Sequence, residues 1–241
     1  MHCPICQTHV DGDSCSTCGH KVTSAAPVIT RESIRRPKIP VDLSLVATID
    51  RTGSSEPFKV GIPKTYRSIV QPVAAKVASL KCSVYTHGDE DEGQHPVLIA
   101  DGCSHEEASS RVDTISYGGG GDPPEHHLSA VLNALQVTPW SSVRGSRGAI
   151  VLFATAESKP LRDGRSARDL GEEVNSRGVL LYLVCQRVPR LVELCDAAGG
   201  LMFEITNDPD PAELQKVAAM LSASIVASTA SGSTVPMTVT V

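Results

Sequence analysis

The chain has 241 residues, 41% of them hydrophobic, and a formal net charge of −5. This size allows one sizeable domain with a small appendage, and an acidic balance without a long basic run argues against nucleic acid or an anionic membrane as the main partner. The first residues, MHCPICQTHV, do not resemble a signal peptide, and no apolar stretch approaches the ~18 residues of a membrane helix. We therefore expect a cytoplasmic protein.

Residues 1–21 contain two Cys-x-x-Cys pairs, CPIC and CSTC, separated by eight residues. This spacing is typical of a zinc ribbon, in which four thiolates surround one Zn²⁺ ion. Two disulfides would need an oxidising compartment, and a redox motif would need a strand followed by a helix. The pattern resembles the single zinc ribbons that begin many bacterial cytosolic proteins. The predicted ligands are Cys3, Cys6, Cys15 and Cys18.

Strands and helices are predicted to alternate from Val41, after a proline-containing linker at 22–40. Apolar runs of strand length lie at 42–49, 80–87, 95–102, 147–155, 177–185 and 199–205. Amphipathic stretches that predict helices lie around 59–79, 104–115, 124–136, 164–176, 189–198 and 210–227. This order predicts a mostly parallel sheet with helices on both faces, and the short passage HGDEDEGQ predicts a hairpin that makes the third strand an antiparallel edge. Residues 228–241 are predicted to be a tail, mobile or bound to a partner.

Three polar loops are expected at the edge of the sheet where ligands bind in open α/β folds, the first and the third directly after predicted strands. The first, DRTGS, places a carboxylate and two hydroxyls at alternating positions. The second, YGGGGDPPEHH, brings two acidic residues to the head of a helix, and the third is ATAES. The candidate site residues in these loops are Asp50, Thr52, Ser54, Asp122, Glu125 and Glu157.

DRTGS resembles the Asp-x-Ser/Thr-x-Ser signature of von Willebrand factor A (vWA) domains, which opens their metal-ion-dependent adhesion site. GGGGDPPE resembles the second loop of that family, closest to members such as the integrin β I-like domain that carry Asp-x-Pro-Glu there. The later strands also resemble the family, and the likeness covers about residues 41–227. It implies a doubly wound, Rossmann-like α/β domain with six strands in the order 3-2-1-4-5-6, the third antiparallel.

The donor atoms of these loops suit a hard divalent cation, because Mg²⁺ prefers oxygen ligands in octahedral geometry. Asp50, Thr52 and Ser54 can turn one carboxylate and two hydroxyls toward a common point. Glu125 would add a second carboxylate, and Asp122 is a ligand, a group that supports a ligand or a helix cap. We expect Mg²⁺, or Mn²⁺ or Ca²⁺, at a site open to solvent.

Two features depart from the family's pattern. Glycines occupy the region of the second loop where the family commonly offers a threonine. In the third loop Thr155 is followed by Ala156 where an aspartate is usual, so either Glu157 takes over that role through water or the site is weakened. His126 and His127 suggest a zinc or catalytic site, but adjacent helical residues point in different directions. We expect both on the rim of the site.

Three functions are compatible with these observations. The first is a non-enzymatic interaction module that binds a partner's acidic side chain through the cation. Bacterial proteins that resemble this pairing of ribbon and vWA domain often act with kinases, phosphatases or AAA+ ATPases in signalling, stress and defence systems. The second is a degenerate scaffold that binds partners without metal, for which Ala156 is the main argument. The third is a metal-dependent hydrolase or phosphotransferase, although no phosphate loop, HExxH motif or nucleophile elbow is present. We favour the first.

Overall fold

The computed structural model describes residues 9–10, 16–18, 38–58 (56–58 by backbone alone), 61–121, 123–140 and 145–237. The chain divides into two units, Met1–Pro37 and Lys38–Val241, and the larger one is described by itself. Cys3, Cys6 and Cys15 lie outside the described residues, and Cys18 belongs to a short turn at 16–18. The ribbon and most of the linker therefore stay predictions from the sequence.

A six-stranded sheet forms the larger unit, in the order β3-β2-β1-β4-β5-β6. The strands are β1 Ile39–Asp50, β2 Val77–His87, β3 Val97–Cys103, β4 Ser146–Phe153, β5 Val179–Cys185 and β6 Leu201–Glu204. All neighbouring pairs are parallel except β2–β3, which is antiparallel. The predicted strand order is confirmed, and the strand that ends at Asp50 lies inside the sheet.

The buried strands follow from their sequences. Along β1, Leu45, Ala47 and Ile49 face one hydrophobic core while Val46 faces the other, as the two-residue period of a strand requires. All seven residues of β5 are buried. A parallel strand covered by helices on both faces has this continuous apolar sequence, which is why the run VLLYLVC could be identified as a strand.

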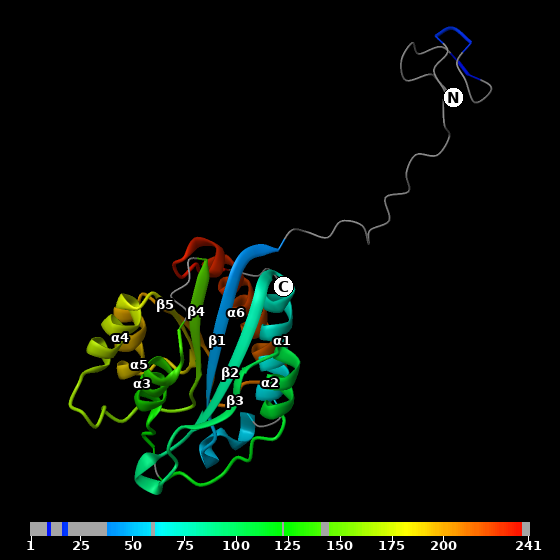
Figure 1. Ribbon diagram of the computed structural model, residues 1–241. Helices are drawn as coiled ribbons and strands as arrows, with labels where there is room; N and C mark the ends of the chain where they lie inside the picture. The colour runs from blue at the N-terminus through cyan, green and yellow to red at the C-terminus, as the bar shows by residue number, and fades with distance from the viewer. Residues whose placement is uncertain are drawn as a thin grey trace. The chain divides into compact units, whose positions relative to one another are not determined.

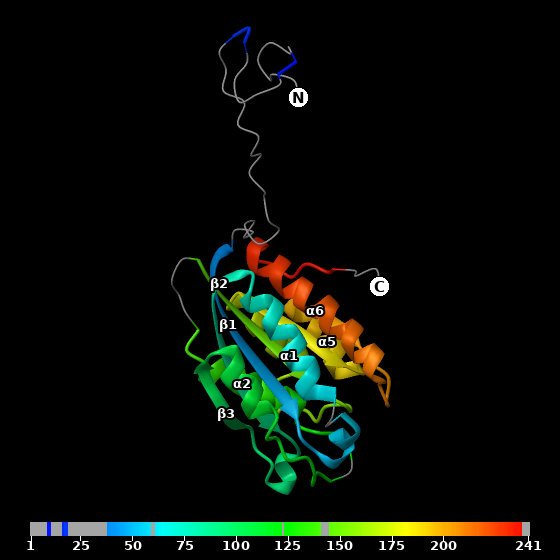
Figure 2. The same cartoon turned by 90° about the vertical axis from the view of Figure 1, so that its right-hand side faces the viewer.

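Helices cover both faces of the sheet (Figures 1 and 2). Helices α1, α2 and α6 pack on one face, and α3, α4 and α5 on the other. Their bounds are α1 Gly61–Ala74, α2 His105–Val112, α3 His127–Val137, α4 Ala167–Ser176, α5 Pro189–Ala198 and α6 Pro211–Ser231, with short 3₁₀ helices η2 Gly53–Phe58 and η3 Glu90–Glu92. Within the described part of the chain, no helix is both long and apolar enough to cross a membrane.

Two predicted boundaries on the N-terminal side are wrong. The helix expected over 59–79 ends at Ala74, two residues after Pro72, whose ring nitrogen has no hydrogen to donate. The chain then enters β2, where Val77 pairs with Ile39. The predicted linker likewise extends too far, because residues 39–40 already belong to β1.

The predicted tail also starts too early. Helix α6 continues to Ser231 and is closed by Gly232, whose φ of 84° is a left-handed conformation that suits glycine. The chain then runs back along α6, where the backbone N–H of Val235 donates to Ser228 Oγ (2.8 Å) and that of Met237 donates to Ser224 Oγ (3.1 Å). These hydroxyls hold residues up to Met237 against the helix.

Candidate metal site at the carboxyl end of the sheet

The candidate site lies where the strand order reverses. From β1 the chain adds β2 and β3 on one side and β4, β5 and β6 on the other, so the loops after β1 and β4 leave the sheet next to each other. Asp50 is the last residue of β1, and Thr155 follows β4. This is the position at which ligands bind in doubly wound α/β folds.

Asp50 is the centre of a network of hydroxyl groups. Thr52 donates to Asp50 Oδ1 from both its backbone nitrogen (2.9 Å) and its Oγ1 (2.8 Å). Thr155 Oγ1 donates to the other carboxylate oxygen, Oδ2, at 2.8 Å. The hydroxyl oxygens of Thr52 and Ser54 lie 2.9 Å apart, as do those of Ser55 and Thr155. The first loop and the third loop therefore meet at one carboxylate.

The expectation of an open site is wrong for most of its members. Asp50, Thr52 and Glu125 are each 1% exposed, whereas Ser54 is exposed. Burial would raise the pKa of Asp50, but His127, His87 and the hydrogen bond from the backbone of Thr52 act in the opposite direction, and the pKa lies below its usual range. Asp50 is therefore ionised at neutral pH.

Glu125 brings a second carboxylate to the same place. If Gly120 carried a Cβ, that atom would lie 2.9 Å from Thr52 Cβ and 3.2 Å from Glu125 Oε1, so the two side chains flank the same glycine. Gly120 has a φ of 77°, and glycine's freedom there lets the loop pass between them. The backbone of Gly53 also donates to the carbonyl of Gly119 at 2.8 Å, which joins the first loop to the second.

The surroundings of the Glu125 carboxylate disfavour its charged form. Its Oε2 is buried and has no hydrogen-bond partner. Burial, and then the charges of Asp50 and Asp89, raise the pKa of Glu125 to about 7. Two carboxylates that approach each other away from water repel unless a cation or a proton neutralises one of them.

The two remaining acidic candidates are Asp122 and Glu157. Asp122 lies outside the described residues. Glu157 Oε1 accepts a hydrogen bond from the backbone nitrogen of Ser158 at 2.8 Å, and the Glu157 carbonyl accepts one from the backbone nitrogen of Glu125 at 3.0 Å. Glu157 therefore holds Glu125 through its backbone, and its place as an indirect metal ligand stays a prediction.

The two adjacent histidines are not rim residues, contrary to the expectation from the sequence. His126 is 4% exposed and His127 is 0% exposed. His127 Nδ1 lies 2.9 Å from Nε2 of His87, and the two rings meet edge to face. Burial, and then the neighbouring His127, lower the pKa of His87 to about 3, and burial also lowers the pKa of His127. The pair is neutral at physiological pH.

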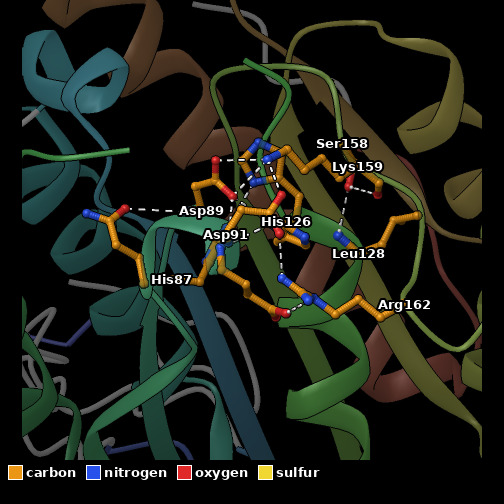
Figure 3. Close-up of polar contacts among 11 residues, drawn as sticks. His87, Asp89, Asp91, His126, Leu128, Ser158, Lys159 and Arg162 are labelled. Carbon is orange, nitrogen blue, oxygen red and sulfur yellow. Dashed lines mark hydrogen bonds and ion pairs between the residues drawn. The ribbon is translucent and has the colours of Figure 1, made fainter. Parts of the chain in front are cut away.

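His126 points instead into an ion-pair cluster around the turn after β2 (Figure 3). Its Nδ1 lies 3.0 Å from Asp89 Oδ1, and Lys159 Nζ donates to both oxygens of Asp89 (2.9 Å each) and to Asp91 Oδ2 (2.7 Å). Arg162 Nη2 donates to Asp91 Oδ1 at 2.6 Å. The sequence predicts only a hairpin for this turn.

Among the residues that the structure describes, two groups of side chains could thus hold a metal ion. One is the oxygen-rich set around Asp50 and Glu125, whose unpartnered Oε2 could ligate a cation and whose hydroxyl and carboxylate oxygens suit Mg²⁺. The other is Asp89, Asp91 and His126, whose ligand atoms all lie within 4.8 Å of one another. The second group already has the Lys159 ammonium among its carboxylates, whereas in the first group no described basic side chain hydrogen-bonds to Asp50 or Glu125.

The sequence matches no protein-family model and no curated protein. Solved structures do resemble the larger unit. The VWA domain of SpRpn10 has a TM-score of 0.59 at 14% identity, covering 73% of this chain and 93% of that one. This chain has the vWA fold. A von Willebrand factor type A structure from Catenulispora acidiphila gives 0.53 at 15% identity (77% and 43% covered), and proximal thread matrix protein 1 of the mussel byssus gives 0.56 at 9% identity (78% and 47% covered).

Proposed function

We propose that this vWA-fold protein is an interaction module in which a divalent cation at Asp50 and Glu125 binds an acidic side chain of a protein partner. Mg²⁺ is the expected ion, with Mn²⁺ and Ca²⁺ as substitutes. Asp50 and Glu125 would supply two negative charges, and Thr52 and Ser54 would supply hydroxyl oxygens. Binding of the ion needs no chemical step, and we assign none.

One observation carries this proposal: the buried, unpartnered Oε2 of Glu125 beside Asp50. A buried carboxylate oxygen without a donor is costly, and a native fold rarely keeps one without a reason. An ion between the two carboxylates would remove that cost. It would also explain why hydroxyls from the first and third loops converge there, because each hydroxyl can turn its lone pairs toward a cation.

A scaffold that binds partners without metal is the second candidate, and Asp50 itself provides the argument. Both oxygens of its carboxylate already accept hydrogen bonds from Thr52 and Thr155. Ala156 also stands where the family usually has an aspartate, so the metal would have one acidic neighbour fewer. In this case the site would be a rigid hydrogen-bonded network without metal, and partner binding would not depend on divalent cations.

We further propose, from the sequence, that the partner belongs to the same multi-protein bacterial system, with a kinase, a phosphatase or an AAA+ ATPase as the expected classes. The zinc ribbon would provide a second contact or a tether, and the setting would be the cytoplasm. The vWA fold supports a protein-interaction role in general, since the SpRpn10 and Catenulispora structures above are vWA domains. Phosphate-release assays would test the hydrolase alternative.

The experiment that tests the proposed function compares partner capture with and without the cation. Full-length protein with its zinc retained is used as bait in extract from the native cells, in Mg²⁺ or in EDTA at a concentration that leaves the zinc bound. A partner retained only in Mg²⁺, and lost with Asp50→Asn, supports the proposal. Equal capture in both buffers and with both proteins favours the scaffold.

The zinc ribbon gives an independent prediction. Purified protein should contain about one Zn²⁺ per chain, held by Cys3, Cys6, Cys15 and Cys18. Cys6→Ser should release it, because small zinc modules owe about 10–16 kcal/mol of folding free energy to the metal. Atomic absorption measures the zinc, and thermal unfolding should show the larger unit unchanged. Full zinc content after this substitution would contradict the assignment.

A further inference from the structure

Two cysteines face each other across strands β2 and β3. Cys82 in the middle of β2 and Cys103 at the end of β3 are direct partners in the antiparallel ladder. Opposite residues in such a ladder have Cα atoms about 4.5–5.5 Å apart, which is within the range that a disulfide bridges. Both side chains pack against the same hydrophobic core, so they lie on the same face of the sheet, and both are free thiols. The backbone therefore places the pair correctly for a disulfide.

An irregularity in the ladder creates this pairing. The next pair along the two strands is Val84 with Ala100. In a regular ladder the residue opposite Cys82 would then be Gly102. One extra residue in β3 shifts the register, so that Cys103 takes this position instead. The backbone nitrogen of Gly102 donates to a serine hydroxyl of β2 at 2.9 Å, and this hydrogen bond holds the shifted register.

The two thiols differ in their access to solvent. Cys82 is 0% exposed, whereas Cys103 is partly exposed, and its Sγ donates to the backbone carbonyl of Cys82 at 3.5 Å. Burial raises the pKa of both thiols, that of Cys82 to about 12, and the nearby Tyr66 hydroxyl acts on Cys82 in the opposite direction. This hydroxyl is buried and has no hydrogen-bond partner among the described residues, so it is available to donate to a Cys82 thiolate.

We propose that Cys82 and Cys103 form a redox modification site, at which a small disulfide such as oxidised glutathione converts the two thiols to an intrachain disulfide. Cys103 reacts first because it is the accessible one: its thiolate attacks one sulfur of the small disulfide, forms a mixed disulfide and releases a small thiolate. The Cys82 thiolate then attacks the Cys103 sulfur and releases the second small thiolate. The two protons from the protein thiols pass to these thiolates, so the products are one protein disulfide and two small thiols.

The disulfide would join the edge strand of the sheet covalently to its neighbour. Strand β3 pairs with β2 alone, and α2 begins two residues after Cys103. A covalent link at this position restricts the unfolded chain and should raise the melting temperature by about 5–10 °C. The inference does not depend on an ion at Asp50, because neither cysteine belongs to the loops of that site.

Peptide mass spectrometry tests the proposal on zinc-loaded, full-length protein that is equilibrated with oxidised glutathione and then alkylated. Trypsin leaves both cysteines in one peptide, residues 82–111, because no lysine or arginine lies between them. Glutamyl endopeptidase then cuts after Glu90 and Glu92, so a disulfide appears as two peptides that stay linked until they are reduced. We expect most wild-type chains to carry this link, and the linked fraction to fall about 10-fold or more when the protein is treated in concentrated urea.

Three variants show where the link forms. Cys103→Ser and Cys82→Ala should each abolish the link and the rise in melting temperature, whereas Cys195→Ala, at a buried thiol elsewhere in the fold, should retain both. Circular dichroism establishes that each variant is folded, and the peptide map distinguishes this link from any that involves the N-terminal cysteines. The wild-type result decides the matter even if a variant does not fold. Two alkylated thiols, a glutathione that stays on Cys103 or a link between two chains, in folded wild type, would each overturn the proposal.

Discussion

Mg²⁺ should raise the thermal stability of the wild-type protein and leave that of Asp50→Asn almost unchanged. The substitution keeps the shape of the side chain and removes one of the two charges that hold the ion. We expect Mg²⁺ affinity to fall about 100-fold or more, since even groups that only support a metal ligand are typically worth about 10–100-fold. At a concentration of about 100 times the dissociation constant, the wild type should gain about 2.7 kcal/mol, and the variant should gain far less.

Asp42→Asn is the matched control for this experiment. Asp42 lies on the same strand at its opposite end and is exposed, so its charge is remote from the proposed ion. Thermal unfolding with and without Mg²⁺ is the measurement. Because Asp50 is buried and accepts from Thr52 and Thr155, Asp50→Asn should also cost about 1–3 kcal/mol without metal, from the weakened hydrogen bonds. An equal Mg²⁺ response in all three proteins would contradict the role of Asp50.

Glu125→Gln should make the metal-free protein more stable than the wild type at pH 8, and the advantage should shrink as the pH falls. The pKa of Glu125 is about 7 in the fold, above its ordinary value of 4.5, so the folded state holds a proton that the unfolded state has lost. The stability that this proton provides is fully present below pH 4.5 and is lost as the pH rises through about 7. A shift of this size corresponds to at most about 3 kcal/mol.

The measurement is the free energy of unfolding in denaturant, for both proteins, between pH 5 and pH 8. His87 and His127 have lowered pKa values and add stability as the pH rises through the acid side of this range, in the opposite direction. Both histidines are present in the variant, so the difference between the two proteins isolates Glu125. Mg²⁺ affinity of the wild type should increase with pH up to about 7, because the ion displaces the proton. Parallel curves for the two proteins would show that Glu125 is ionised throughout.

The fold could be predicted because its signals are local. Each strand is an apolar run bounded by turns, and a short loop between β2 and β3 can only join antiparallel neighbours. Helix ends were less predictable, since α6 continues through serines and a threonine whose hydroxyls are buried against the structure. Residues 220–231 contain too few large apolar side chains for the buried face of α6 to be identified from the sequence.

The site could be predicted only in part, because its contacts join residues that are far apart in the sequence. Thr155 and Ser55 are 100 positions apart, and their contact depends on how two loops leave the sheet. The burial and the contacts of the two histidines could not have been predicted from the fact that they are adjacent in the sequence. His126 precedes α3 and turns to Asp89, while His127 begins the helix and turns to His87. Nothing in the local sequence shows whether these two side chains point into the fold or are exposed on the rim of the site.

Calorimetric titration of zinc-loaded, full-length protein with Mg²⁺ at pH 8, after removal of other divalent ions, tests the central claim most directly. At this pH Glu125 is mostly ionised, so the ion meets two carboxylates. We predict saturable binding of one Mg²⁺ per chain, abolished by Asp50→Asn and retained by Asp42→Asn. Heats of dilution alone, from a protein shown to be folded, would contradict the claim that this edge of the sheet binds a divalent cation.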